Sequence, residues 1–186
     1  MKILSKLIFQ DIPLFLLTKN ARPKLKVAEV SSIKNFVEDG LFIEGRNTLT
    51  LSSGLSVDFL YWEPENLSAN NNKLLVCFNA AVGQRDVKSA PFFSGVGLAA
   101  DLGIPVICIA DPLVSDNREL GLAWYTGGEE SNSLQLLIAE LLNQIYDHYQ
   151  YEMIICGGSG GGFASLVQAS LITVPATVVV WNSQSS

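Results

Sequence analysis

The stretch IICGGSGGGFASL (residues 154–166) places five glycines around one serine, between an apolar run and an amphipathic segment. Its first residues are typical of the end of a buried strand, and its last residues of the start of a helix. The pattern G-x-S-x-G is met by Gly157, Ser159 and Gly161. We therefore expect Ser159 to project from a sharp strand-to-helix turn at the carboxyl edge of a sheet, where α/β proteins place their ligand sites.

The second part of the chain alternates between strand and helix candidates. Four continuous apolar runs predict strands: LLVCFN (74–79), PVICIA (105–110), MIICGG (153–158) and ATVVVWN (176–182). Continuous apolarity indicates burial on both faces, as in parallel strands that helices cover. The helix candidates between them are residues 92–103, 131–149 and 161–172. This alternation predicts an α/β fold over residues 73–186, with a mainly parallel sheet and flanking helices.

The first part of the chain has a different pattern. In residues 37–62, short alternating runs are separated by EDG, GRN and SSG, which predicts an antiparallel N-terminal hairpin region. The strands are expected near 41–45, 48–51 and 56–61. Residues 1–36 form an N-terminal extension, with a short amphipathic helix and a buried extended segment in its first part. We expect residues 1–186 to form a single domain, since this length suffices for one sizeable core.

Composition and charge exclude several classes of function. The formal net charge is −6, and the only basic run is RPKLK (22–26), so we expect no nucleic-acid partner. No run of about 18 apolar residues is present, so we expect no membrane span. Cys77, Cys108 and Cys156 each lie in an apolar run and match no zinc-binding spacing. Three such thiols favour a reducing, cytoplasmic location, and we expect neither a metal nor a cofactor.

Other readings of the glycine-rich stretch fit less well. A Walker-type phosphate loop ends in Gly-Lys-Ser/Thr, and this stretch contains no lysine. A dinucleotide fingerprint starting at Gly158 would require a small residue where Phe163 stands, and an acidic residue about 20 positions on, which is absent. Two interpretations of the stretch therefore stay open: a nucleophile elbow, and a close-packed turn without a chemical role.

A serine nucleophile also requires amides that stabilise a developing oxyanion. The N–H of Gly160, at the expected start of the helix, is one candidate. A second is the N–H of Ala80, which follows Asn79 at the end of the 74–79 strand, where a small residue allows a substrate to approach. An ordinary transition from strand to loop is the alternative at this position.

Four motifs together resemble a known superfamily. FNAA (78–81), GLAWYTGG (121–128), GGSGGGFAS (157–165) and WNSQ (181–184) occur in the order and strand context of α/β-hydrolases. More narrowly, the chain resembles bacterial α/β-hydrolase-like proteins that are associated with surface-polysaccharide and glycoprotein export, of the accessory-Sec kind. The resemblance covers roughly residues 56–186, and the elbow is its specific part.

The resemblance implies a serine esterase or acyl transferase that acts on an ester or an acylated glycan. Ser159 would be the nucleophile, and the backbone of Ala80 and Gly160 would form the oxyanion hole. Trp124 and Tyr125, in the GLAWYTGG motif, are candidates for lining the pocket, with packing as their alternative role.

The acid and base of a triad are missing from their expected places. The only histidine, His148, precedes Ser159 in the 131–149 helix and is expected at the opposite edge of the sheet. No Asp or Glu follows Ser159. Asp111 follows the 105–110 strand at the correct edge, where it would either touch the site or cap the DPL turn. The chain thus resembles the front two-thirds of a hydrolase: a fragment, a truncated protein without a triad, or a chain completed by a partner.

Three functions follow from these observations. The leading one is a serine esterase or acyl transferase that uses Ser159. The second is a non-catalytic pseudo-hydrolase that binds a glycan or a partner subunit in the same cleft. The third is an assembly component, whose edge strand at 176–182 would pair with a protein partner or a second copy.

Overall fold

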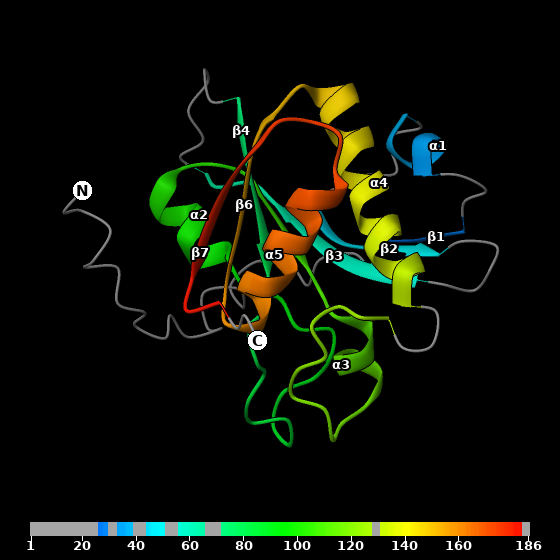
Figure 1. The fold of residues 1–186 in the computed structure, drawn as a ribbon, viewed down its shortest axis with the longest axis vertical. Helices are drawn as coiled ribbons and strands as arrows, with labels where there is room; N and C mark the ends of the chain where they lie inside the picture. Colours follow the sequence, from blue (N-terminus) through cyan, green and yellow to red (C-terminus); the bar gives the residue numbers. More distant parts are fainter. Residues whose placement is uncertain are drawn as a thin grey trace.

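The fold is built on a seven-stranded mixed sheet with the strand order β1-β2-β3-β5-β4-β6-β7 (Figure 1). The computed structural model describes residues 26–29, 33–38, 44–50, 56–65, 72–127 and 131–183. The strands are β1 (Lys26–Glu29), β2 (Gly45–Thr50), β3 (Ser56–Trp62), β4 (Lys73–Phe78), β5 (Val106–Ile109), β6 (Glu152–Gly158) and β7 (Ala176–Trp181). The helices are α1 (Ile33–Glu38), α2 (Val96–Leu102), α3 (Pro112–Asp116), α4 (Ser131–Tyr149) and α5 (Gly160–Leu171).

The four apolar runs of the second part form the parallel half of the sheet, which confirms the α/β fold class. β5, β4, β6 and β7 lie side by side, and each neighbouring pair is parallel. All of β5 is buried, and so is β4 apart from its first residue. The helices α2, α4 and α5 alternate with these strands along the chain, as the sequence predicts. α2 ends at Leu102, and Gly103, its C-cap, adopts the left-handed conformation expected at this position.

The hairpin region is simpler than the sequence expectation. The strands expected at 41–45 and 48–51 are replaced by the single strand β2, although residues 41–43 lie outside the described residues. The GRN triplet, expected as a turn, is paired with β3. Within it, the Nε and NH2 groups of Arg46 donate to Asp58 Oδ1 on β3, at 3.3 and 3.2 Å. This cross-strand pairing is a long-range contact, and it outweighs the local preference for a turn.

The outer edge of this half also differs from expectation. β2 and β3 are antiparallel, as expected, and β3 pairs antiparallel with β5. The outermost strand, β1, pairs in parallel with β2 and comes from the segment assigned to the N-terminal extension. α1 takes up positions 33–38, so residues 37 and 38, expected in the strand region, are helical. The amphipathic helix expected at the start of the chain lies outside the described residues.

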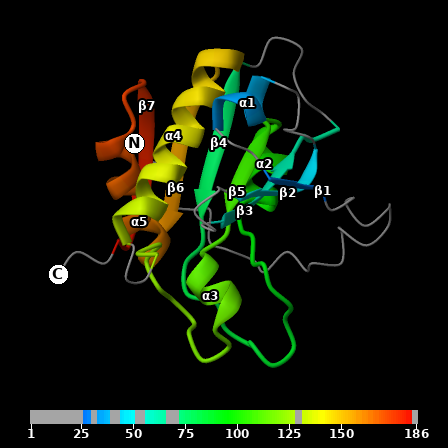
Figure 2. The ribbon, with the colours of Figure 1, turned by 90° about the vertical axis from the view of Figure 1, so that its right-hand side faces the viewer.

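Helices cover the two faces of the sheet unequally (Figures 1 and 2). α1, α4 and α5 pack on one face, around a large cluster that includes Ile138 and Leu142 of α4 together with Phe59 and Ile155 of the sheet. α2 packs on the other face, over a smaller cluster centred on β4 and β5. β7 forms one edge of the sheet, and its residues alternate between partly exposed and exposed.

The three cysteines lie in register on the neighbouring strands β5, β4 and β6, beneath α2. Cys77 is the partner of Cys108 on one side and of Cys156 on the other, and all three are free and buried. The Sγ atoms of Cys77 and Cys156 are 3.2 Å apart. Burial raises the pKa of the Cys108 thiol well above its usual range. A thiol in this environment is a poor nucleophile, as expected for a packing residue.

None of the helices in the described part of the chain has the length and apolarity that crossing a membrane requires.

The packing of α4 gives a test of the fold. Ile138 is completely buried between α4 and the sheet, whereas Leu136 on the same helix is 56% exposed. We expect Ile138→Ala to lower the free energy of unfolding by about 2–5 kcal/mol, because it leaves a cavity in the core. Leu136→Ala, the matched control, should change it by less than about 0.5 kcal/mol. Urea denaturation followed by circular dichroism measures both, and equal effects would contradict the packing described.

Candidate active site

Ser159 lies alone between β6 and α5. β6 ends at Gly158, α5 begins at Gly160, and Ser159 has φ 51° and ψ −123°. Residues other than glycine rarely adopt this backbone conformation, which is typical of a strained serine at a strand-to-helix turn. Two backbone hydrogen bonds hold it: the Ser159 amide donates to the Trp181 carbonyl of β7 at 3.1 Å, and its carbonyl accepts from the amide of Phe163 at 3.1 Å. The chain therefore makes the turn that the G-x-S-x-G pattern predicts.

The glycines on either side of this turn leave no room for a side chain. A Cβ on Gly157 would overlap the carbonyl of Gly161. A Cβ on Gly161 would overlap the carbonyl oxygen of Phe78 and lie 2.8 Å from that of Asn79. The absence of both Cβ atoms lets the first turn of α5 approach the ends of β6 and β4. Glycine is required here by contact with neighbouring backbone.

This approach places the two candidate oxyanion donors at the same edge of the sheet. Gly160 is the first residue of α5, and amides in the first turn of a helix have no acceptor within that helix. Ala80 follows Asn79, whose carbonyl lies against Gly161. Ser159 is half-buried, and its side chain does not cap α5. The hydroxyl and both amides thus belong to segments that meet where the parallel strands end.

Asn79 is fixed by hydrogen bonds from both its backbone and its side chain. Its amide donates to the phenol oxygen of Tyr125 at 2.7 Å. Its side-chain nitrogen donates to the carbonyl of Phe92, and its side-chain oxygen accepts from Ser94 Oγ at 2.7 Å. A residue held at three points has little freedom to rotate. The peptide that joins it to Ala80 is consequently held as well.

The aromatic pair of the GLAWYTGG motif divides into an exposed and a buried residue. Trp124 is 41% exposed, and Tyr125 is 1% exposed. Besides accepting from Asn79, the Tyr125 hydroxyl donates to the carbonyl of Ile109 at 2.7 Å. Its ring meets that of Phe78 edge-on, with centroids 5.0 Å apart. Tyr125 therefore ties the ends of β4 and β5 together from within the core.

Asp111 caps α3 and holds the loop that follows this helix. Its Oδ1 accepts from the amide of Leu113 at 3.2 Å, and its Oδ2 accepts from the amide of Tyr125 at 2.8 Å. The side chain is buried, and burial raises the pKa of its carboxyl against the opposing effect of these amides. These contacts show that Asp111 caps the DPL turn.

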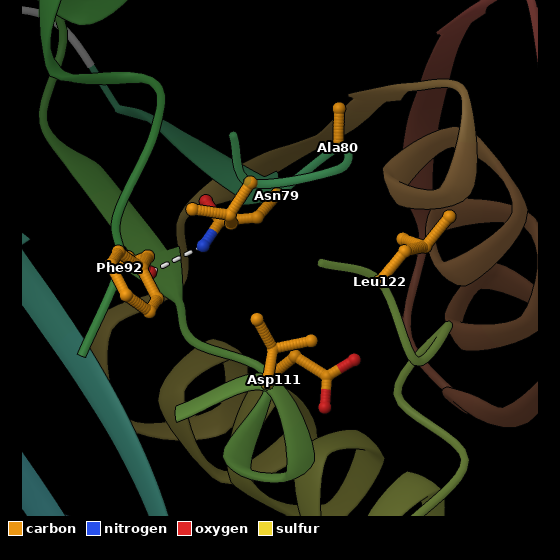
Figure 3. Close-up of a pocket in the computed structure, with 7 residues that line it drawn as sticks. Asn79, Ala80, Phe92, Asp111 and Leu122 are labelled. Atoms are coloured by element: carbon orange, nitrogen blue, oxygen red, sulfur yellow. Dashed lines mark hydrogen bonds between the residues drawn. The ribbon is translucent and has the colours of Figure 1, made fainter. Parts of the chain in front are cut away.

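A small pocket opens beside these residues (Figure 3). Asn79 and Ala80 lie on one side and Asp111 at the base, while Leu122 lies on the far side with its side chain directed toward α5. Apolar side chains complete the wall: Val82, Phe92 and Val114. The empty volume is about 210 Å³, part of it open to solvent. Of the candidate site residues, Asn79, Ala80 and Asp111 line this pocket, whereas Ser159, Gly160, Trp124 and Tyr125 do not.

Arg85 anchors the loop that follows Ala80, a role that sequence reasoning missed. Its NH2 group donates to the carbonyls of Val114 and Asn117, at 2.6 and 2.8 Å, at the end of α3. Its guanidinium carbon lies 4.4 Å from the ring centre of Phe92. A cation at the carboxyl end of a helix is favourable because the last carbonyls there have no partner within the helix. The sequence around Arg85, GQRDVK (83–88), matches no motif that would have singled it out.

Neither of the two candidates in the sequence, His148 or Asp111, is available as a base for Ser159. His148 lies near the end of α4, just before β6 begins, and Ser159 lies just after β6 ends. β6 has 7 residues, which corresponds to about 20 Å of strand. Both oxygens of Asp111 accept backbone amides. Within the described ranges, no group of three His, Cys, Asp or Glu side chains could hold a metal ion.

Comparisons with known proteins give similar solved structures but no relative by sequence. No protein-family model matches the sequence, and no curated protein matches it. The chain is similar to native sOPH, with 16% identity over 70% of this chain and 49% of that one, and a TM-score of 0.45. The chain is also similar to native pOPH, with 14% identity over 70% of this chain and 50% of that one, and a TM-score of 0.44. A third similar structure is that of brefeldin A esterase, a bacterial homologue of human hormone-sensitive lipase. Its identity is 11% over 75% of this chain and 42% of that one, and the TM-score is 0.46.

The chain spans about half the length of the solved structures it matches. Because these sequence identities and TM-scores are low, the fold class rests on the chain's own sheet topology.

The approach of α5 to β4 can be tested with alanine. We expect Gly161→Ala to destabilise the fold by about 1–3 kcal/mol or more, because its Cβ would meet backbone that cannot move aside cheaply. Gly83→Ala is the matched control, because nothing lies within 4 Å of a Cβ at that position. Thermal unfolding measures both variants. A Gly161→Ala protein as stable as Gly83→Ala would show that the contact is absent.

The bridging phenol gives a second test. Tyr125→Phe removes the acceptor of the Asn79 amide and the donor to the Ile109 carbonyl while it keeps the ring. We expect a loss of about 1–3 kcal/mol in the free energy of unfolding, because two buried backbone groups lose their partner. Amide exchange at Asn79 should also become faster. Unchanged exchange at Asn79 would show that the phenol does not hold it.

Proposed function

We propose that the protein is a serine esterase or acyl transferase of the α/β-hydrolase kind, with Ser159 as its nucleophile. The observation that carries the proposal is the backbone of Ser159, a non-glycine residue at φ 51° between a buried strand and a helix. Such strain is retained where the surrounding structure enforces it, and it clusters at functional sites. In an elbow of this shape, the serine hydroxyl stands clear of its own backbone.

The neighbouring amides support the same chemistry. Ser159 Oγ would attack the acyl carbon, and the N–H groups of Gly160 and Ala80 would donate to the oxygen that becomes negative. The N-terminal end of α5 also favours negative charge at this point. The fixed position of Asn79 supports the role given to Ala80, because a donor that is already in place needs no reorganisation during the reaction.

The proposal requires a base for the Oγ proton. His148 is at the opposite edge of the sheet, and Asp111 is bound to two amides. We propose that the base comes from a segment or a partner outside the described residues. Without one, any rate enhancement would come only from the oxyanion hole and from binding.

The substrate and the biological setting rest on the sequence resemblance alone. We propose an ester or an acylated glycan as substrate and a role in surface-polysaccharide biosynthesis or export. A cytoplasmic location is proposed from the cysteines instead. The three free, buried thiols are compatible with a reducing compartment.

A non-catalytic role is the alternative, and the contacts of Asp111 favour it. A carboxylate that holds two backbone amides is part of the scaffold, so the chain's acid at this edge is already engaged. The same pocket would then bind a glycan or a partner subunit without turnover. The exposed edge strand β7 would suit pairing with a protein partner or a second copy.

A fluorophosphonate probe separates the two proposals, because it reacts covalently only with an activated serine. We expect labelling of the protein at Ser159, identified by mass spectrometry of the modified peptide. Ser159→Ala should abolish the label, and Ser170→Ala, which changes an exposed serine of α5, should retain it. If the probe leaves Ser159 unmodified while the fold is intact, the non-catalytic alternative is supported.

A further inference from the structure

Cys77 and Cys156 face each other across the neighbouring parallel strands β4 and β6. They are register partners, and their Sγ atoms are 3.2 Å apart. Neighbouring strands lie about 4.8 Å apart, and disulfide bonds join residues whose Cα atoms are about 4.4–6.8 Å apart. The two cysteines therefore already meet the backbone spacing that a disulfide requires. We propose that they form an oxidation site, which peroxide converts into a disulfide whether or not Ser159 is a nucleophile.

The two thiols differ in how readily they lose a proton. Cys77 acts as the donor in their hydrogen bond, which lowers the pKa of Cys156 although burial opposes the shift. The same hydrogen bond and burial raise the pKa of Cys77. Because the thiolate is the reactive form of cysteine, Cys156 is the sulfur that meets the oxidant first. Cys77 keeps its proton and lies beside the product.

Cys108, the third thiol of the row, is shielded from oxidation. It is the register partner of Cys77 on β5 and is completely buried in the cluster beneath α2. Its sulfur accepts from the amide of Val96, and burial raises its pKa well above the usual range. A Cβ on Gly95 would overlap Cys77 Sγ and lie 3.4 Å from Cys108 Sγ, so the turn before α2 lies over both sulfurs.

An oxidant can reach the pair from the side of β7. Cys156 is 2% exposed, but its register partner Val179, on the edge strand, is 36% exposed. Register partners on parallel strands share a face of the sheet, so Val179 lies beside Cys156 on the face that carries α2. Trp181, the next residue of β7 on this face, is 40% exposed. Exposed side chains change rotamer within nanoseconds, which admits a molecule as small as hydrogen peroxide.

The oxidation has two steps. The Cys156 thiolate attacks one oxygen of hydrogen peroxide, the O–O bond breaks, and the hydroxide that leaves takes up the Cys156 proton as water. This step gives a sulfenic acid on Cys156. The Cys77 sulfur then attacks the Cys156 sulfur, the S–O bond breaks, and a second water leaves with the Cys77 proton. Two thiols are oxidised to one disulfide, and one peroxide is reduced to two waters.

The disulfide would lie directly beneath the candidate site. Cys77 is three residues before Ala80, and Cys156 is three residues before Ser159. The bond would thus join the two strands that lead to the loop after β4 and to the elbow. In a reducing compartment such a bond is transient, as in proteins that sense oxidants. The site would then report peroxide through the strands that support Ser159.

The experiment treats the folded full chain with hydrogen peroxide and then alkylates its free thiols with iodoacetamide under denaturing conditions. In the wild-type protein, Cys108 alone of the three cysteines should be alkylated. Mass spectrometry without reduction should identify a peptide pair linked through Cys77 and Cys156. Dithiothreitol should restore all three thiols. Cys108→Ala is the matched control, and it should form the same link in an amount within about twofold of wild type.

Two further variants separate the roles of the two sulfurs. In Cys77→Ala, oxidation of Cys156 should stop at the sulfenic acid, which dimedone traps in a covalent adduct. In Cys156→Ala, both Cys77 and Cys108 should stay alkylatable after peroxide treatment. A dimedone adduct on Cys108 in the first variant, or a link between Cys77 and Cys108 in the second, would contradict the assigned roles.

The wild-type protein alone can overturn the proposal, so the test does not depend on whether the variants fold. Three alkylated cysteines after peroxide treatment, or a disulfide that joins two separate chains, would show that Cys77 and Cys156 are not a redox pair. The oxidised protein should also unfold at a temperature about 5 °C or more above that of the reduced protein, because the bond restricts the unfolded chain. An equal or lower unfolding temperature would show that the bond does not fit the native sheet.

Discussion

The first turn of α5 lies against the last residue of β4 at a separation that excludes a side chain on Gly161. This contact fixes where the helix begins relative to the sheet. Ser159 must then turn within a single residue, and it does so at a positive φ. The strain of such a residue, about 1–3 kcal/mol, persists only where the packing around it leaves no relaxed alternative. The position of the hydroxyl and that of the amide of Gly160 both depend on this approach.

A second set of contacts fixes the loops at the same edge of the sheet. Asp111 binds the amide of Tyr125, whose hydroxyl in turn binds the amide of Asn79. Arg85 joins the loop after Ala80 to the end of α3. Asp111, Tyr125 and Asn79 satisfy one another's polar groups, and the NH2 group of Arg85 has two carbonyl partners, whereas its Nε and NH1 groups are buried without a hydrogen-bond partner among the described residues. Together these contacts form a frame that orders loops without secondary structure. The amide of Ala80 is presented by this frame.

The parallel half of the sheet and the elbow could be predicted from the sequence because local patterns mark both. Apolar runs predicted β4–β7, and the spacing of glycines around Ser159 predicted the turn. The pairing of β2 with β3 replaced the turn expected near residue 46, and no local pattern could show it. The wall of the pocket could not be predicted either, since Leu122 lies in a loop whose sequence shows no hydrophobic periodicity. Tyr125 was named as a candidate for lining the pocket, but only the fold shows that its hydroxyl joins two strand ends.

The central claim is that the hydroxyl of Ser159 and the amides of Gly160 and Ala80 converge on one reacting group. A crystal structure of the protein after reaction with a fluorophosphonate tests it most directly. Convergence of the three groups requires a phosphonate bonded to Ser159 Oγ, with its free oxygen about 2.7–3.1 Å from both amide nitrogens. A phosphonate oxygen directed away from both amides, or a Ser159 with the negative φ of a regular helix, would contradict it.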